Sequence, residues 1–540
     1  MPFEITTESP LKPVRATQPA RAAAADRQVH VDVLVVGAGP TGLTAASEAR
    51  RHGLSVRIIE RKPRRSTFSK ALVVHARTLE VFEAMGIADA VVAAGTRFAA
   101  LNTHTGTGRR AVRVDLLAQP WGDTAYPYWL SIPQYATEQI LESHLAALGV
   151  DVEWQAALDD ITDHGDLVEA RIQYADGGCE TIRSRWLIGC DGARSRVREQ
   201  TGLHLNRADA GATFVLADVK TTAHLQEDEG HVYLHPDGLL LIVPMPEPRR
   251  WRIIAHVPTP PDGSPITIDA TYLDALIHRR AGLEFASHDI AWDSQFKLSH
   301  GVVDHYRKGR IFLAGDAAHV HSPVGGQGLN TGIQDAHNLI WKLATARHLD
   351  AGAAKALLDS YEAERRPVAR AMVQGTARAT GALTARRPLV RRALGAIAPH
   401  LIARSAIQAR LGRRVGMLEI GYPNSPLTKV SAAPTAVGRR LPNPRLHTGG
   451  RLHERLNRAG HTWIVRSRQD GTHPHTGHPR WADIPLVFLT DDMLAEPLDQ
   501  LARVTLVRPD GYIAATGTTT EAVWAQLPAT ALPFRYSHTT

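Results

Sequence analysis

The sequence predicts an α/β protein in which a doubly wound parallel sheet carries an antiparallel (α+β) insert and is followed by a further domain. A valine-rich strand, a helix and a second strand follow one another over residues 31–60, the unit from which doubly wound sheets are built. Short strands separated by Pro, Asp and Gly turns occupy residues 213–256, a pattern typical of an antiparallel meander. After Gly421 the composition changes to strands and turns. The 540 residues exceed the roughly 250 to 300 at which a single core stops growing, so we expect several domains.

Domain boundaries are expected where these patterns change. Residues 1–29 have no periodic apolar face and no signal-peptide core, which predicts a mostly disordered extension. A transit peptide is the alternative, but the acidic residues Glu4, Glu8 and Asp26 argue against it. The first part of a nucleotide-binding domain is expected at 30–205, within which 95–130 contribute to the substrate side, and its last part at 301–377. A substrate-binding β-sheet domain at 206–300 separates these two parts. A helical connector at 378–420 and a C-terminal domain at 421–540 follow.

The inserted sheet is where we expect the substrate pocket, because ligands favour interfaces between domains. Several side chains could contribute to its lining, although the residue types favour burial as structural aromatics for each of them. They are Tyr126, Tyr128, Tyr233, His235 and Trp251.

The overall charge and the cysteine count limit the class of partner. The formal net charge of +8 could attract nucleic acid, a membrane surface or anionic small molecules. No nucleic-acid-binding motif accompanies this charge, so we expect no nucleic-acid partner. Apolar runs such as Gly238–Met245 fall far short of the roughly 20 residues of a membrane helix, so no membrane span is expected. Two cysteines, Cys179 and Cys190, are too few for a disulfide framework and suit a cytoplasmic protein.

A glycine-rich turn follows the first strand. In Gly37-Ala-Gly39-Pro40-Thr41-Gly42 the first glycine allows the tight turn, the second lets the backbone approach a diphosphate, and the third permits close helix–strand packing. The phosphate would meet a helix N-terminus, where free amides favour it. Glu60, at the end of the second strand, would accept hydrogen bonds from ribose hydroxyls, with Arg61 beside it. The turn predicts a Rossmann-like dinucleotide site but does not distinguish FAD from NAD.

Two further elements repeat the strand-then-turn arrangement. Asp191-Gly192 follows a buried strand and precedes a capped helix. Gly315-Asp316 follows another strand, and a glycine-rich loop through Gly328 to Asn330 then opens a further helix. This third element is the most specific of the three.

Taken together, the three elements resemble the class A flavoprotein monooxygenases of the para-hydroxybenzoate hydroxylase fold. Asp191-Gly192 matches the family's DG motif, Gly315-Asp316 its GD motif, and Gln134 its flavin-contacting glutamine. The resemblance implies that Pro323 lies near the flavin C4a edge. It also implies cofactor contacts from Arg77 and from the loop residues Gly326, Gly328, Leu329 and Asn330, whose amides would face the pyrimidine end of the flavin.

The activity implied by this resemblance is that of an FAD-dependent monooxygenase. NADPH or NADH would reduce the flavin, O2 would add to give a C4a-hydroperoxide, and one oxygen atom would pass to a phenolic or polycyclic, polyketide-like aromatic substrate. The residues do not identify a catalytic base. Baeyer-Villiger insertion, a plain oxidase or dehydrogenase, and a non-catalytic flavin-binding assembly partner stay open, as does the choice between monomer and homodimer.

The C-terminal third resembles the extra domain of phenol, pentachlorophenol and polyketide hydroxylases, which is thioredoxin-like. The likeness lies in Tyr422–Leu427, Gly438–Pro442 and Val507–Tyr512. This part of the chain holds no cysteine, so no thiol–disulfide role is expected. The tract His473-Pro-His475-Thr-Gly-His478 is expected to be a loop without a metal, because no carboxylate or cysteine joins it.

Overall fold

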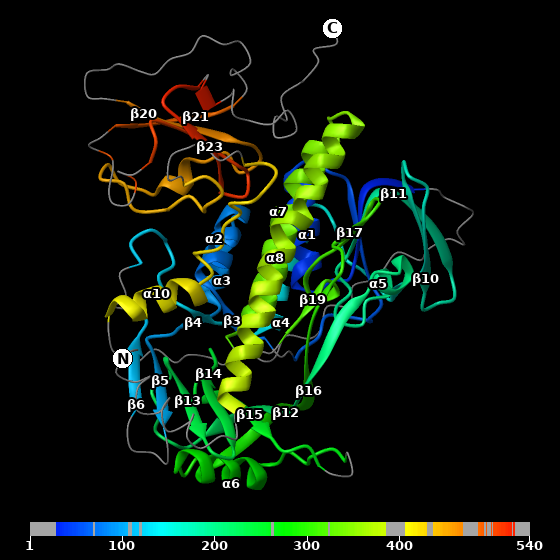
Figure 1. Ribbon diagram of the computed structural model, residues 1–540. Coiled ribbons are helices and arrows are strands. Elements are labelled where there is room, and N and C mark those ends of the chain that lie inside the picture. Colours follow the sequence, from blue (N-terminus) through cyan, green and yellow to red (C-terminus); the bar gives the residue numbers. More distant parts are fainter. Residues whose placement is uncertain are drawn as a thin grey trace, which may run out of the picture.

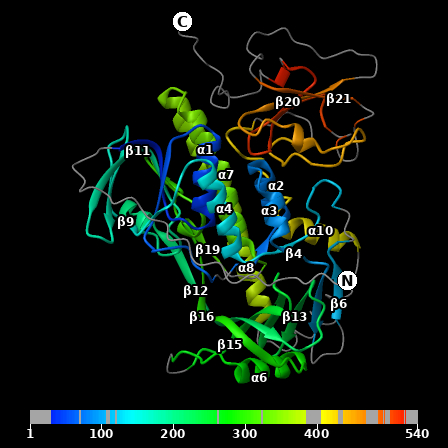
Figure 2. The same cartoon turned by 180° about the vertical axis from the view of Figure 1, so that it is seen from behind.

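The structure of the protein is a computed structural model, and its described residues form four sheets. Figures 1 and 2 show their arrangement. The long helix α8 (Ala351–Thr384) crosses the centre of the molecule. The structure describes residues 29–68, 71–105, 111–117, 121–260, 264–321, 325–384, 405–428, 436–467, 484–490, 493, 498, 501–520 and 522–523.

The first sheet is mainly parallel and holds the nucleotide-binding pattern. Its strands lie in the order β17-β18-β11-β1-β2-β8, and β1 pairs in parallel with both β11 and β2. Helices α1, α4 and α7 lie side by side against it in Figure 2, with α1 between the other two. The bounds are β1 Val29–Val36, α1 Pro40–Arg51, β2 Val56–Glu60, α4 Gln134–Ala147, β8 Glu153–Trp154, β9 Ala156–Asp163, β10 Val168–Tyr174, β11 Cys179–Gly189, β17 Arg307–Lys308, β18 Ile311–Leu313 and α7 Gln327–Ala346.

The second sheet is the insert, and its residues alternate between two apolar faces. Along β12, Val215 packs on the side of α6, whereas Phe214 and Leu216 belong to a separate apolar cluster on the other side. The sheet is larger than the meander predicted, because β5 and β6 join it from residues 100–115 and β5 pairs in parallel with β13. The bounds are β5 Ala100–Thr105, β6 Ala111–Asp115, β12 Leu205–Thr221, β13 Glu229–His235, β14 Gly238–Pro244, β15 Arg250–Val257, α6 Ala270–Ala281, β16 Ser287–Val303 and β19 His319–Val320.

A short three-stranded ribbon connects the first two sheets. Its order is β3-β7-β4, and Ser131 of β7 donates from Oγ to the carbonyl of Pro244 in β14 at 2.6 Å. The ribbon therefore joins the edge of the insert to the parallel-sheet domain. The bounds are β3 Val73–Val74, α2 Ala76–Met85, α3 Ala88–Ala93, β4 Thr96–Arg97 and β7 Leu130–Ser131.

The C-terminal sheet has the order β21-β20-β22-β23, with β20 parallel to β21 and antiparallel to β22. The thioredoxin-like shape of this region stays a prediction, and the tract from His473 to His478 lies outside the described residues. Helix α8 continues to Thr384, past the residue at which a connector was expected to begin, and α10 follows at Ser405–Val415. The strand bounds are β20 Thr462–Ser467, β21 Leu486–Thr490, β22 Val504–Val507 and β23 Ile513–Gly517.

A buried network of charges joins the C-terminal domain to α7 and α8. Arg508 donates from its two terminal nitrogens to Glu364 of α8 at 2.7 and 2.9 Å, and it also pairs with Asp510. Lys342 of α7 donates to the same Glu364 at 2.8 Å. Burial alone would raise the pKa of Glu364, but Arg508 and Lys342 hold that pKa below its usual range. The C-terminal domain is thus anchored by ion pairs that water does not reach.

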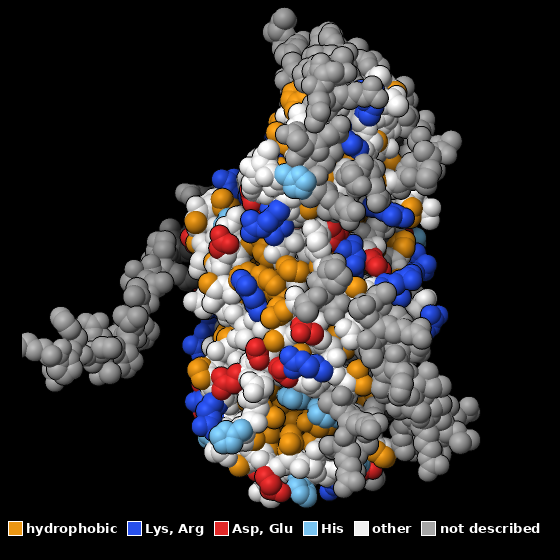
Figure 3. All heavy atoms as spheres, turned by 90° about the vertical axis from the view of Figure 1, so that its left-hand side faces the viewer, with side chains coloured by type: hydrophobic (Ala, Val, Ile, Leu, Met, Phe, Trp, Pro, Cys, Tyr) orange, Lys and Arg blue, Asp and Glu red, His pale blue; other side chains and the backbone are white. Residues whose placement is uncertain are grey.

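The surface of the protein carries charged and apolar side chains. On the face shown in Figure 3, Lys and Arg side chains are scattered among acidic and apolar ones. Within the described residues, no helix combines the length and the apolar character that a bilayer span requires.

Candidate active site

Four chain segments meet at one edge of the parallel sheet. Val36 lies opposite both Gly189 and Ile59, and Gly189 lies opposite Leu313. The strands β1, β2, β11 and β18 therefore end level with one another, and the turns that follow them lie side by side. In open α/β sheets this carboxyl edge is where ligands bind.

The glycines of the first turn are required by close backbone contacts. Gly37 has a φ of +106°, and a Cβ atom there would lie 2.5 Å from the carbonyl oxygen of Cys190. A Cβ at Gly42 would lie 1.8 Å from the carbonyl oxygen of Gly37. At Gly39, by contrast, a Cβ would meet no atom within 4 Å. Open space therefore lies in front of Gly39, at the N-terminus of α1, where a diphosphate was predicted to approach.

Glu60 ends β2 beside this turn. Its carboxylate accepts from the amide of Ala38 at 3.0 Å and from that of Lys62 at 3.1 Å. The side chain is half-buried, whereas the neighbouring Arg61 is exposed. Glu60 thus lies where the sequence predicted a ribose partner.

The Asp-Gly turn after β11 is held by local caps. Asp191 Oδ2 accepts from the amides of Arg196 and Val197 at 2.6 and 3.1 Å, which caps α5 (Arg196–Thr201). Burial raises the pKa of Asp191. Gly192 has a φ of +80°, which suits a glycine in the turn. Arg198 then donates to the carbonyl of Ala317 at 2.9 Å and so links this turn to the next one.

The third turn packs against the first. Gly315 has a φ of +62°, and a Cβ there would lie 2.5 Å from Thr41 Oγ1. A Cβ at Gly332 of α7 would lie 2.3 Å from the same oxygen. Thr41, which follows Pro40 in the first turn of α1, therefore fits between two glycines, while the side chain of Asp316 is exposed at the same edge.

A buried carboxylate that the sequence did not single out supports this turn. Asp335 accepts from the amide of Gly315 at 3.1 Å, from His319 Nε2 at 2.8 Å and from Arg365 Nε at 2.7 Å. Burial alone would raise the pKa of Asp335, but Arg365 and His319 hold it below its usual range. An acidic residue among the buried apolar positions Ile333, Ala336, Leu339 and Ile340 of one helix was the available signal. Asp335 is a positioning residue for Gly315.

Asn330, in the first turn of α7, bonds to the glycine loop and to the segment before α2. Its Oδ1 accepts from the amide of His75 at 2.8 Å, and its Nδ2 donates to the carbonyls of Val73 and Gly326 at 2.9 and 2.7 Å. Leu329 packs against the main core, and a Cβ at Gly328 would lie 2.8 Å from the His321 ring. Asn330 therefore holds the start of α7 in place. Pro323 lies outside the described residues.

Two predicted cofactor residues have protein partners of their own. Gln134, the first residue of α4, donates from Nε2 to Glu138 at 2.8 Å. The guanidinium of Arg77 is buried against the C-terminal domain, donating to Glu80 at 2.9 Å and to the carbonyl of Asp510 at 2.6 Å. A cofactor contact from Arg77 stays a prediction.

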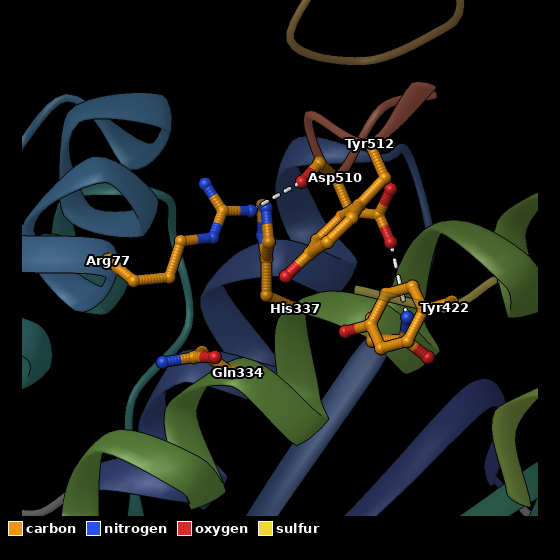
Figure 4. Close-up of a pocket in the computed structure, with 7 residues that line it drawn as sticks. Arg77, Gln334, His337, Tyr422, Asp510 and Tyr512 are labelled. Atoms are coloured by element: carbon orange, nitrogen blue, oxygen red, sulfur yellow. Dashed lines mark hydrogen bonds between the residues drawn. The ribbon is translucent and has the colours of Figure 1, made fainter. Parts of the chain in front are cut away.

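Figure 4 shows a small cavity at that interface, lined by Arg77, Gln334 and Asp510 among others. It lies between α2, α7 and the turn before β23, and none of Gly39, Glu60 and Asp316 lines it. Within the described residues, Arg77 Nε and Gln334 Oε1 are buried without a hydrogen-bond partner, a donor and an acceptor that one water could satisfy. We therefore place the chemistry at the sheet edge and not in this cavity.

The second sheet turns an apolar face toward the parallel-sheet domain. Phe214, Leu216 and Ile254 lie on that face, and Arg252, next but one to Ile254, donates to the carbonyl of Ala71 at 3.2 Å. Arg252 also forms a buried bidentate pair with Asp218.

The five aromatic candidates lie elsewhere. Tyr233 and Trp251 pack in the opposite cluster with α6, and His235 lies two residues from Tyr233 on the same strand face. Tyr128 belongs to the main core and Tyr126 packs against it. Strand alternation places the side chains of Tyr233, His235 and Trp251 on the α6 side of the sheet, whereas Tyr126 and Tyr128 lie outside the strands and pack with the main core. These positions favour a structural role for each of the five.

The donor set at the sheet edge fits an FAD. Open space at Gly39 faces a helix N-terminus, Glu60 lies at the adjacent strand end, and the exposed Asp316 completes the edge. The N-terminus of α7 begins at the glycine loop beside it. These groups match the diphosphate, ribose and ring of a dinucleotide in chemical type.

Comparison with known proteins agrees with this site. The FAD binding domain family matches residues 30–376. The chain is 37% identical over 512 residues to the 6-methylpretetramide 4-monooxygenase of Streptomyces rimosus, covering 90% of each chain. It is 34% identical over 354 residues to the pentachlorophenol 4-monooxygenase of Sphingobium chlorophenolicum, covering 64% of this chain and 63% of that one. Among solved structures, the anhydrotetracycline hydroxylase of Streptomyces rimosus has a TM-score of 0.72 at 29% identity, covering 92% of this chain and 96% of that one. The chain therefore belongs to the FAD binding domain family and is a flavoprotein monooxygenase that uses FAD, NAD(P)H and O2.

Proposed function

We propose that the enzyme hydroxylates a phenolic or polycyclic, polyketide-like aromatic substrate. The observation that carries this proposal is the apolar face of the second sheet, around Phe214 and Ile254, which is turned toward the cofactor domain. Such a face suits a flat, largely apolar ring system. The relatives named above act, by their names, on 6-methylpretetramide, pentachlorophenol and anhydrotetracycline, which supports the same substrate class.

We assign the cofactor contacts by chemical type. Gly37, Gly39 and Gly42 would admit the diphosphate at α1, with Pro40 and Thr41 shaping the turn, and Glu60 would bind the ribose. Asp191 and Gly192, Gly315 and Asp316, and the loop residues Gly326, Gly328, Leu329 and Asn330 would enclose the rest, with Gln134 from α4 and Pro323 beside the ring. The N-terminus of α7 would stabilise negative charge on the pyrimidine end.

When bound and reduced, FAD supplies the activation of O2, which the protein's own side chains cannot provide. The chain's contribution is to orient the aromatic ring against the cofactor and to exclude water. Phe214, Leu216 and Ile254 are buried and can displace solvent around the ring. The two free cysteines, of which Cys190 is buried, support a cytoplasmic location, where we propose that the enzyme acts as a monomer or homodimer.

Oxygen-transfer chemistry is tested with ¹⁸O2. Purified enzyme given NADPH or NADH and candidate phenols or polyketides should release products 18 mass units heavier than the substrate, with the label on a ring carbon. Insertion of the label next to a carbonyl would identify a Baeyer-Villiger reaction instead. Peroxide release without labelled product, or no stimulation of NAD(P)H oxidation by any aromatic, would contradict the proposal.

The exposed carboxylate of the third turn is expected to affect cofactor affinity without affecting the fold. Asp316→Ala should weaken FAD binding by about tenfold or more, the scale of one hydrogen bond to a charged group. Because the side chain is exposed, the melting temperature of the flavin-free protein should not change. Titration of flavin-free protein with FAD measures the affinity, and Asp176→Ala, in the exposed turn between β10 and β11, is the matched control. Unchanged affinity in Asp316→Ala would remove this residue from the site.

A further inference from the structure

A histidine and a tryptophan with unused hydrogen-bonding groups lie between the glycine loop and the second sheet. His75 is 1% exposed and precedes α2, and the Trp129 ring meets it edge to face at 5.8 Å between centroids. Within the described residues, His75 Nδ1 and Trp129 Nε1 are both buried without a hydrogen-bond partner. A buried polar atom left unpaired is costly, so both atoms require partners that the described part of the chain does not provide.

The tautomer of His75 is set by its other nitrogen. Nε2 lies 2.8 Å from the carbonyl oxygen of Gly325, which can only accept, so Nε2 carries the proton and donates it. Burial lowers the pKa of His75 to about 4, so the ring is neutral at pH 7. Nδ1 is therefore a hydrogen-bond acceptor, and Trp129 Nε1–H is a donor.

The surroundings place this pair where the substrate is expected. On one side His75 is joined to the glycine loop twice, through Gly325 and through Asn330. On the other side the Trp129 ring meets Phe98 edge to face at 6.5 Å between centroids, in a cluster against which Val243 of β14 in the second sheet also packs. The pair thus spans the junction between the cofactor domain and the insert.

We propose that His75 and Trp129 recognise one ring hydroxyl of the substrate, an inference that rests on the proposed function. The hydroxyl donates its hydrogen to His75 Nδ1, and its oxygen accepts from Trp129 Nε1. A single hydroxyl, with one donor and a free acceptor, complements this acceptor and donor pair. The bond to His75 also increases electron density on the ring carbons ortho and para to that hydroxyl, which favours their attack on an electrophilic oxygen.

A matched pair of probes tests the site. FAD-loaded enzyme, without NAD(P)H so that no turnover occurs, is titrated with 1-naphthol and with 1-methoxynaphthalene while the flavin absorbance is followed. The methyl ether can accept from Trp129 but cannot donate to His75. Wild-type enzyme should bind the naphthol about tenfold more tightly, the scale of one buried hydrogen bond.

The variants separate the two contacts. His75→Phe should reduce the naphthol preference to about onefold while ether affinity stays within about twofold. Trp129→Phe should weaken both probes about equally and keep the preference; it carries the test if His75→Phe does not retain flavin. His231→Phe and Trp341→Phe remove other nitrogens that are unpartnered within the described residues, and they should leave both affinities unchanged.

Several results would overturn the inference: equal affinity of wild type for both probes, no binding of either, or full preference in His75→Phe. Oxygen transfer from ¹⁸O2 is measured on the same preparations with a substrate that is turned over. If oxygen transfer is intact but the hydroxyl preference is absent, only the proposed hydroxyl site is contradicted. If no aromatic compound receives labelled oxygen, the proposed function itself is contradicted.

Discussion

A Gly39→Glu enzyme should purify colourless, with less than about one-tenth of the wild-type flavin content, because the added carboxylate occupies and repels the diphosphate position. The backbone at Gly39 is extended, at φ −78° and ψ −178°, so a side chain is accepted there without strain. A Cβ at this residue also meets no atom of the protein within 4 Å. The variant should therefore fold normally and lack only its cofactor.

Flavin content is measured from the absorbance of FAD released on denaturation, and folding from circular dichroism. Gly375→Glu is the matched control, since it adds the same charge at an exposed position of α8 where a Cβ also meets nothing within 4 Å. It should keep full flavin. Gly42→Ala should instead fail to fold, because its Cβ would lie 1.8 Å from the carbonyl oxygen of Gly37. A yellow, stoichiometric Gly39→Glu protein would disprove the placement of the cofactor.

An Arg508→Met enzyme should lose about 3 to 5 kcal/mol of unfolding free energy, the usual cost of removing one partner from a buried ion pair. Arg508 and Glu364 are each 1% exposed or less at the side chain, so the carboxylates of Glu364 and Asp510 would be left without their main cation. Urea unfolding measures the loss. Lys355→Met, at the exposed pair with Asp359, should cost at most about 1 kcal/mol. A similar small loss for Arg508→Met would show that the C-terminal domain is not anchored through this network.

The same network predicts how stability depends on pH. The pKa of Glu364 and that of Asp510 are both below their usual ranges in the folded protein, because Arg508 outweighs their burial. Such groups stabilise the fold above their unfolded pKa values, and that contribution is lost as the pH falls through and below about 4. Wild-type stability should therefore decline in acid. Arg508→Met should show a shallower decline, because removal of the cation reduces the shift that produces it.

The strand-helix-strand pattern and the glycine spacing were sufficient to predict the parallel sheet, because they reflect local backbone requirements. Gly37 and Gly42 are needed by contacts within one turn and its neighbour, and sequence spacing records such needs directly. The meander at 213–256 was also recognised from local turns. The addition of β5 and β6 to this sheet was not predicted, because the pairing of β5 with β13 joins residues more than 120 positions apart.

The surroundings of the aromatic candidates and of Arg77 depend on contacts that local sequence patterns do not specify. Whether Tyr233 faces the cofactor or α6 depends on the phase of the strand, since a shift of one residue reverses every side chain. Arg77 lies in a motif-like segment, but its partner Asp510 comes from the far end of the chain.

By itself, the sequence predicted a dinucleotide site at three strand-ending turns, since steric demands on glycine and the position of an acidic residue are local properties. Only the tertiary structure decided which buried groups support those turns and which face of the insert is turned toward them. Asp335 reaches Gly315, Arg365 reaches Asp335, and His75 reaches Gly325 only after the chain has folded. The reason is physical: the hydrogen bonds and ion pairs available to a buried charge or nitrogen depend on neighbours that the packing of distant segments brings close.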